Sequence, residues 1–254
     1  MISLAGKAAL ITGGSRGIGA ASVRFFAQAG ADVAFNYHRS RTAAEQVEQE
    51  ARKHGTQVIS CKADLSRNAD GKRLVEFARE RLGRVDILVA NAGIWNVTGI
   101  GIEKMPERDW DEMIRVNLKS IYSVVHHAVP HMIAQKGGRI VALSSTAGQR
   151  GESMHTHYGA SKGAIISFVK GLSTELAPHN ILVNCVAPGW VDTEMSRPVL
   201  KTKAGRKFAT AGIPLGRVGT AEAIAGAILF LASDLATFIT GEILNVNGGA
   251  ILCG

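Results

Sequence analysis

The sequence predicts an α/β fold: one domain with a doubly wound, seven-stranded parallel sheet and helices on both of its faces. Seven short apolar runs recur along the chain, at 8–12, 33–37, 58–61, 87–90, 140–144, 181–187 and 243–246. They are continuous rather than alternating, which is typical of strands buried on both faces. Stretches with helical periodicity separate them, at 18–29, 42–54, 68–82, 110–133, 158–176 and 221–232. Strands that alternate with helices indicate a parallel sheet.

The domain organisation follows from the absence of any linker, repeat or change in composition. The chain has 254 residues, of which 46% are hydrophobic, so residues 1–254 are expected to form one domain with a sizeable core. Two stretches interrupt the alternation, 94–106 after the fourth strand and 190–214 after the sixth. Ligands of open α/β sheets lie beyond the carboxyl ends of the strands, so we predict a substrate lid at about 190–214.

The chain is basic, with a formal charge of +8 from 29 Lys and Arg against 21 Asp and Glu. Such a balance raises nucleic acid, an anionic membrane or an anionic small molecule as partners. The densest basic run is 38–41, and the other runs are short, separated and without interleaved aromatic residues. We therefore expect no nucleic-acid partner and interpret most of the charge as scattered over the surface. Glycines interrupt the first apolar run, so neither a signal peptide nor a membrane partner is expected.

The cysteines and histidines offer no metal framework. Cys61, Cys185 and Cys253 lie far apart without a C-x-x-C pair, which is typical of reduced thiols in a cytoplasmic protein. His126, His127 and His131 lie on a predicted helix, and the i,i+4 pair His127 and His131 could in principle bind a metal, but no third ligand is nearby. A helix face or a subunit contact is the favoured interpretation, and no metal is expected.

The first predicted strand ends in a glycine-rich turn. Residues 12–19 have the sequence T-G-G-S-R-G-I-G and lead directly into a predicted helix. Glycines at this spacing let the backbone approach a pyrophosphate and place that anion at the positive end of the helix. A similar turn can occur without a ligand, but one that follows a strand, opens a helix and begins a βαβ unit favours dinucleotide binding.

The end of the second predicted strand indicates which dinucleotide is bound. An acidic residue there would bind the ribose hydroxyls of NAD(H), but the chain has Tyr37, His38, Arg39 and Ser40. The guanidinium of Arg39 suits a 2′-phosphate, and Arg16 in the glycine turn could add a second positive charge. These arginines could instead be solvated surface charges. We predict NADP(H) in preference to NAD(H).

Catalytic candidates follow the fifth predicted strand. Tyr158 and Lys162 are four residues apart and share one face of a predicted helix. A nearby ammonium favours ionisation of a phenol, whose unperturbed pKa is near 10. Ser144 and Ser145 end the fifth strand, where a hydroxyl could stabilise a developing oxyanion or serve only the local turn. No G-x-S-x-G elbow surrounds them, which argues against a hydrolase nucleophile.

These motifs together resemble the short-chain dehydrogenase/reductase family, and the resemblance covers nearly the whole chain. The shared positions are the glycine turn at 12–19, Asp64 with Leu65, Asn91-Ala92-Gly93, Asn117, Ser145, Tyr158 with Lys162, and the P-G segment at 188–193. Ala90 departs from the family pattern, in which many members have asparagine. The tail at 213–249 resembles the bacterial branch that includes 3-oxoacyl-[acyl-carrier-protein] reductases and glucose-dehydrogenase-like enzymes.

The resemblance implies an NADP(H)-dependent oxidoreductase with a Rossmann fold, which transfers a hydride between the nicotinamide and a carbonyl or secondary alcohol without a metal. Tyr158 would be the general acid or base, Lys162 would lower its pKa and bind the nicotinamide ribose, Ser145 would polarise the substrate oxygen, and Asn117 would hold a water. The implied cofactor contacts are Gly13, Ser15, Arg16, Gly17, Ile18, Gly19, Tyr37, His38, Arg39, Ser40, Asp64, Leu65, Asn91, Ala92, Gly93, Tyr158, Lys162, Pro188, Gly189, Val191 and Thr193.

The substrate side is less defined. The predicted pocket residues are Ser145, Tyr158, Trp95, His155 and Trp190. The two tryptophans could equally serve only to pack the lid. His155 and His157 could equally serve only the structure of their loop. Members of the resembled branch are usually tetramers, so a homotetramer is expected. The alternative function is a non-catalytic NADP(H)-binding sensor on the same fold, for which Tyr158 and Lys162 would not be needed together.

Overall fold

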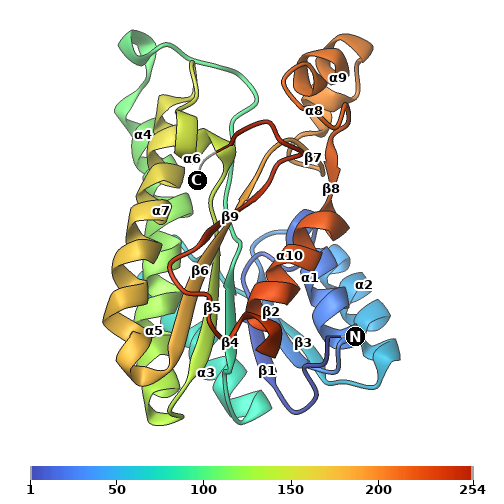
Figure 1. Ribbon diagram of the computed structural model, residues 1–254, viewed down its shortest axis with the longest axis vertical. Helices are drawn as coiled ribbons and strands as arrows, with labels where there is room; N and C mark the ends of the chain where they lie inside the picture. Colours follow the sequence, from blue (N-terminus) through green and yellow to red (C-terminus); the bar gives the residue numbers. More distant parts are fainter. Residues whose placement is uncertain (1, 253–254) are drawn as a thin grey trace.

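The computed structural model describes residues 2–252 and contains a seven-stranded sheet in which every strand is parallel to its neighbours. Its strand order is β3-β2-β1-β4-β5-β6-β9 (Figure 1). The strands are β1 (Ala8–Ile11), β2 (Asp32–Tyr37), β3 (Val58–Lys62), β4 (Ile87–Ala90), β5 (Gly138–Leu143), β6 (Ile181–Pro188) and β9 (Ile243–Val246). The predicted doubly wound parallel sheet in a single domain is confirmed.

Helices cover both faces of the sheet (Figure 1). One layer holds α1 (Gly17–Gln28), α2 (Arg41–Ala51) and α10 (Ala221–Ala232). The opposite layer holds α3 (Asn68–Leu82), α5 (Ser120–Ala134) and α7 (Thr156–Leu176). Within β1, Leu10 packs into the second layer while Ala9 and Ile11 pack into the first. This two-sided burial is the physical reason that the strands are continuous apolar runs.

The strand order determines where a ligand can bind. From β1 the chain moves outward to β2 and β3, then returns to place β4 on the other side of β1. The segments that follow β1 and β4 therefore diverge and leave a crevice at the carboxyl edge of the sheet, which is where open α/β sheets bind ligands. The glycine turn and the three-residue segment at 91–93 lie at this edge.

The helix predicted at 110–133 differs in detail. Helix α4 (Glu107–Ile114) continues through a π-helical turn (Arg115–Lys119) into α5, and the turn buries Asn117 completely. The hydrophobic periodicity predicts one continuous helix here and does not indicate the turn, which is a single-turn π-helical segment within it. Helix α7 begins at Thr156, so His157 is fully buried within a helix rather than in the preceding loop.

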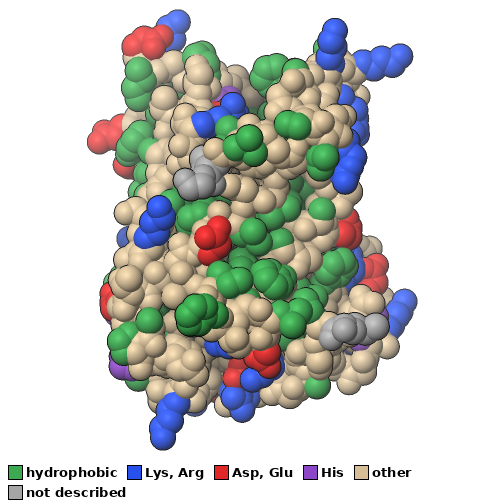
Figure 2. All heavy atoms as spheres, viewed as in Figure 1, with side chains coloured by type: hydrophobic (Ala, Val, Ile, Leu, Met, Phe, Trp, Pro, Cys, Tyr) green, Lys and Arg blue, Asp and Glu red, His purple; other side chains and the backbone are tan. Residues whose placement is uncertain are grey.

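The stretch predicted as irregular at 190–214 contains short elements: β7 (Val191–Asp192), α8 (Arg197–Leu200) and α9 (Lys203–Thr210). Strand β7 pairs with β8 (Gly219–Thr220), and α8 and α9 rise above the sheet (Figure 1). Figure 2 shows Lys and Arg side chains along the upper right of the molecule, over α8 and α9. An ion pair of 2.9 Å between Arg206 Nη2 and Asp192 Oδ2 ties α9 to β7.

Two further findings concern membrane-spanning helices and cysteines. In the described part of the chain, no helix is long and apolar enough to cross a membrane. Cys61 and Cys185 are free thiols, and Cys253 lies outside the described residues.

Candidate active site

The glycine turn after β1 is packed so closely that no side chain has room at Gly14 or Gly19. A Cβ on Gly14 would lie 2.6 Å from the ring of Phe35, and one on Gly19 would lie 2.1 Å from the carbonyl oxygen of Gly13. Gly13 itself has a φ of +68°, in the left-handed region that favours glycine. The turn is therefore pressed against the ends of β2 and β4.

The N-terminus of α1 has the properties of an anion site. Its N-cap residue, Arg16, makes no side-chain cap, and the first turn contains no acidic residue. The first amide groups of a helix have no partner within the helix, so those of Gly17, Ile18 and Gly19 are available to an anion. A Cβ on Gly17 would lie 3.4 Å from Thr193, which places that residue beside the turn.

Asn36, at the end of β2, holds the glycine turn in place and was not among the predicted site residues. Its Oδ1 accepts a hydrogen bond of 2.9 Å from the Gly13 amide, and its Nδ2 donates one of 3.1 Å to the carbonyl of Ala63. The side chain is buried, so both ends of the amide are satisfied by the protein. The only feature of the sequence that could have indicated this role is the amide side chain at the polar end of the strand.

Thr12 makes the equivalent connection on the β4 side. Its Oγ1 accepts hydrogen bonds of 2.9 Å from the amides of Asn91 and Ala92, and Asn91 Nδ2 donates one of 2.8 Å to the Thr12 carbonyl. The glycine turn and the 91–93 segment are thus one rigid unit.

Beyond β2, the residues predicted to choose the cofactor line the same edge. Tyr37 ends the strand and is partly buried, Ser40 precedes α2, and His38 and Arg39 are exposed. Within residues 2–252, neither Arg39 nor Arg16 forms an ion pair with a carboxylate. Both guanidinium groups are therefore free to bind a phosphate.

Asp64, which follows β3, is held as a carboxylate. Burial acts to raise its pKa, but hydrogen bonds from Ser66 and the charges of His38 and Arg115 outweigh burial and lower the pKa. Ser66 Oγ donates a hydrogen bond of 2.6 Å to Asp64 Oδ1, and Arg115 donates to the same Ser66 hydroxyl. Leu65 beside it is buried.

Gly93 lies where Asn117 and Lys162 meet. A Cβ on Gly93 would be 3.2 Å from Asn117 Oδ1 and 3.5 Å from Lys162 Nζ, so both groups border the same small space. Asn117 Oδ1 accepts a hydrogen bond of 2.7 Å from the Ile94 amide, and its Nδ2 donates to the Ile94 carbonyl and to Ser161 Oγ. The π-helical turn thus fixes the loop that follows β4.

Helix α7 and the end of β5 bring the remaining candidates together. Lys162 Nζ donates a hydrogen bond of 2.9 Å to the Leu143 carbonyl and lies 5.9 Å from the centroid of the Tyr158 ring. Ser145 caps the short helix α6 (Thr146–Arg150) by accepting a hydrogen bond from the Ala147 amide, and its hydroxyl acts to lower the pKa of Tyr158. The phenol, the ammonium and the hydroxyl therefore meet at the carboxyl edge of the sheet.

Burial shapes the protonation of this group. It raises the pKa of Tyr158 to about 12, against the lowering effect of the Ser145 hydrogen bond and with the carboxylate of Glu152 adding to the rise. Burial also lowers the pKa of Lys162 to about 8. The sequence predicts that Lys162 lowers the pKa of Tyr158, but in the structure the ammonium is hydrogen-bonded to the Leu143 carbonyl and desolvation of the phenol dominates.

The end of β6 closes the site from the other side. Pro188 is the last residue of the strand, and Gly189 has so little space that a Cβ would lie 3.0 Å from the side chain of Asn247. Val191 is buried in β7, and Thr193 faces the glycine turn. The segment at 188–193 therefore lies between the glycine turn and α8.

An aromatic cluster borders the site. Trp95 stacks on His155 with 5.2 Å between ring centroids, and the edge of Trp190 meets Trp95 at 5.8 Å. Phe208 on α9 extends the cluster, at 6.4 Å from Trp190. The structure thus brings together Trp95, His155 and Trp190, the three ring-bearing pocket residues predicted beside Tyr158. Phe208 extends this group, and no feature of the sequence indicated it.

Comparison with known proteins defines the class. A family model described as enoyl-(acyl carrier protein) reductase matches residues 13–250. The chain belongs to the short-chain dehydrogenase/reductase family of oxidoreductases.

Among curated relatives, the 3-oxoacyl-[acyl-carrier-protein] reductase FabG of Chlamydia muridarum is 40% identical over 249 residues, which cover 97% of this chain and 98% of that protein. A short-chain dehydrogenase from Burkholderia cenocepacia, solved in complex with NADP, has a TM-score of 0.91 and 33% identity, with coverage of 97% of this chain and 98% of that one. Carveol dehydrogenase from Mycobacterium avium, solved in complex with NAD, has a TM-score of 0.93 and 29% identity, with coverage of 98% and 99%. Since both cofactors occur on nearly the same backbone, the fold alone does not select between them.

The clamp formed by Asn36 yields a test. Asn36→Asp keeps the acceptor for Gly13 but replaces the donor with a carboxylate that faces the Ala63 carbonyl. A lost buried hydrogen bond costs about 1–3 kcal/mol, so we expect NADPH to bind roughly tenfold more weakly. Fluorescence titration measures this affinity, with Asn68→Asp on the exposed end of α3 as the control for charge and amide loss. Equal affinities for the two variants would contradict the role of Asn36.

Proposed function

We propose that the protein is an NADP(H)-dependent oxidoreductase that interconverts a carbonyl compound and a secondary alcohol. The observation that carries this proposal is the meeting of Tyr158, Lys162 and Ser145 at the carboxyl edge of the sheet, beside a glycine turn that can accept an anion. Membership in an oxidoreductase family supports it. The carboxyl edge of the sheet would then hold both the dinucleotide and the carbonyl substrate.

Tyr158 is the proposed proton donor in reduction. Its pKa near 12 keeps the phenol protonated at neutral pH, which is the form that can give a proton to a carbonyl oxygen. Ser145 Oγ accepts from the Ala147 amide, so its own proton can be directed to the same oxygen and stabilise the charge that develops there. For alcohol oxidation the phenol must lose its proton, which a nearby positive charge would assist.

Lys162 and Asn117 are the proposed route by which Tyr158 regains its proton. Their Nζ and Oδ1 atoms border the space at Gly93. The Oδ1 of Asn117 uses one lone pair for the Ile94 amide, and the second can hold a water beside the ammonium. Buried groups with well-matched hydrogen bonds keep this geometry rigid, as proton transfer requires.

The residues present fit a dinucleotide. The crowded glycine turn, the uncapped N-terminus of α1 and the unpaired Arg39 would hold the pyrophosphate and a 2′-phosphate, and Asp64 would bind near the adenine. When bound, the nicotinamide supplies or accepts the hydride. Arg39 favours NADP(H), and the relative solved with NADP supports that preference.

The substrate class is proposed from two sources. The curated relatives reduce 3-oxoacyl groups by name, which makes a 3-oxoacyl thioester the first candidate. The aromatic cluster of Trp95, His155, Trp190 and Phe208 would form an apolar wall for the chain or ring attached to the carbonyl.

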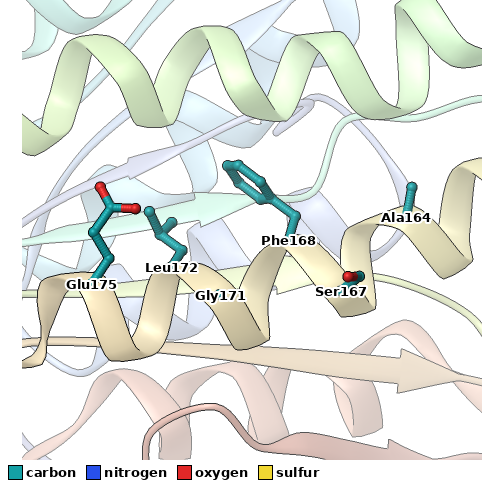
Figure 3. A pocket seen from close by; sticks show the side chains of 6 residues that line it. All are labelled: Ala164, Ser167, Phe168, Gly171, Leu172 and Glu175. Atoms are coloured by element: carbon teal, nitrogen blue, oxygen red, sulfur yellow. The ribbon is translucent and has the colours of Figure 1, made fainter.

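A cytoplasmic homotetramer completes the proposal. Figure 3 shows Phe168, Leu172 and Glu175 projecting from one side of α7, where they line a hollow of about 490 Å3 with Ala164, Ser167 and Gly171. This hollow is separate from the candidate active site, and its apolar lining suits a contact between subunits.

The proton donor is tested by Tyr158→Phe. We expect kcat for NADPH-dependent ketone reduction to fall by about 10²–10⁴-fold, because the general acid is lost while the ring remains. NADPH affinity should change little. The assay follows NADPH absorbance with a panel of ketones, 3-oxoacyl thioesters and quinones, and Tyr122→Phe on exposed α5 serves as the control. If the wild-type protein binds NADPH but converts no substrate of the panel, the enzymatic function is contradicted and a non-catalytic NADP(H)-binding sensor is supported instead.

Cofactor selection is tested by Arg39→Asp. The carboxylate would repel a 2′-phosphate and accept hydrogen bonds from ribose hydroxyls, so NADPH should bind about 10–100-fold more weakly and NADH more tightly. Calorimetric titration of both cofactors gives the ratio, with Arg108→Asp on α4 as the control. A wild-type protein that prefers NADH would refute the proposed preference.

The pH dependence of reduction identifies Lys162. Its protonated form assists the transfer, so kcat/KM for NADPH should be constant at low pH and decrease as the pH rises through about 8. Tyr158 stays protonated over this range and does not produce that limb. In Lys162→Arg the cation persists, so the residual activity should keep its plateau to higher pH. If Lys162→Arg shows the same decrease of kcat/KM as the pH rises through about 8, a group other than Lys162 is responsible for it.

A further inference from the structure

The positive charge of the chain is concentrated in one segment. Residues 195–217, here called the basic segment, contain six Lys and Arg and no Asp or Glu, in a chain of net charge +8. The six cations are Arg197, Lys201, Lys203, Arg206, Lys207 and Arg217. Arg197 lies on α8 and Lys203, Arg206 and Lys207 lie on α9, with Lys201 between the two helices and Arg217 after them. The sequence predicts mostly scattered charge, but Lys and Arg side chains gather over α8 and α9 (Figure 2).

These cations face solvent. All six are exposed, and only Arg206 forms an ion pair within residues 2–252, with Asp192. Five positive charges are therefore left without a carboxylate partner in the described structure. Such a group repels itself, and a negatively charged surface would relieve that repulsion.

Exposed apolar side chains accompany the cations. Phe208 is 72% exposed, Leu215 66% and Met195 43%. Ala209, next to Phe208, is buried and anchors α9, so that Phe208 and Lys207 project outward. A basic helix with a protruding aromatic residue is the pattern of a segment that lies in a membrane interface.

We propose that the basic segment docks on an anionic lipid surface and that the carbonyl substrate reaches the active site from there. The substrate part of this inference rests on the proposed function. Lysines and arginines bind the lipid phosphates, Phe208 and Leu215 enter the headgroup region, and the chain remains peripheral. The expectation of no membrane partner rests on the absence of a spanning segment, and the peripheral contact proposed here needs none.

A lipid surface suits these observations better than an acidic protein. Specific protein interfaces require shape complementarity, with a packed core surrounded by a polar rim. The basic segment instead presents flexible lysines around isolated apolar side chains. Phe208 also contacts Trp190, so the surface that would meet lipid continues directly into the aromatic cluster at the active site. A path of this kind suits a lipophilic carbonyl compound.

The experiment is sedimentation of the full-length protein with vesicles. Binding to vesicles of phosphatidylcholine with about 30% phosphatidylglycerol is expected, with little binding to phosphatidylcholine alone and a decrease at high salt. The triple variant Lys201→Gln, Lys203→Gln, Lys207→Gln should bind at least about tenfold more weakly, since each lysine near an anionic surface contributes about fivefold. The matched control is Lys7→Gln, Lys53→Gln, Lys170→Gln, which removes three exposed lysines elsewhere and should bind like the wild type.

Two further measurements separate this inference from the proposed function. Phe208→Ser should weaken vesicle binding without a change in charge, and Tyr158→Phe should bind vesicles as the wild type does. If the wild-type protein reduces no carbonyl compound but the lysine variants still differ, docking stands and the function fails. Absence of binding to the anionic vesicles, equal loss in the two triple variants, or selective binding to an acidic protein overturns the docking proposal.

Discussion

The close contact between the glycine turn and the ends of β2 and β4 is the constraint on which the site depends. Gly14 lies against the ring of Phe35, and Asn36 and Thr12 hold the turn from either side through buried hydrogen bonds. Because no side chain fits at Gly14 or Gly19, the backbone of the turn lies directly at the N-terminus of α1, with amides left for an anion. A bulkier residue at either position would move the anion site away from the strand ends and from the residues proposed for catalysis on α7.

Burial sets the chemistry on the other side of the crevice. Lys162 is 5% exposed, and the loss of water lowers its pKa toward neutrality while the same desolvation raises that of Tyr158. These opposite shifts suit the two groups to the different tasks proposed for them: Tyr158 would hold a proton until an acceptor oxygen is present, and Lys162 would exchange a proton near physiological pH. The hydrogen bond from Lys162 to Leu143 and the contacts of Asn117 with Ile94 hold these groups to the strand ends.

The regions outside this rigid unit differ in character. The aromatic cluster and the basic segment are built from side chains that face solvent or one another, on loops and short helices. Such segments vary without disturbing the sheet, which is why a fold shared with NADP-bound and NAD-bound relatives can serve different substrates. The regions proposed to choose the substrate are thus separated physically from the residues proposed to handle the proton and the cofactor.

The sequence by itself determined the sheet, its two layers and the order of the motifs, because continuous apolar strands and a strand–glycine–helix turn are local patterns. It also placed Tyr158, Lys162 and Ser145 near one edge, since parallel strands share their carboxyl ends. Tertiary structure alone decided the rest: the π-helical turn that buries Asn117, the clamp at Asn36, the contact of Phe208 with Trp190 and the gathering of the lysines on α8 and α9. Each depends on residues distant in sequence or on exposure. The same is true of the pKa of Tyr158, because desolvation, which outweighs the lowering effect of Ser145, arises only when the chain has folded.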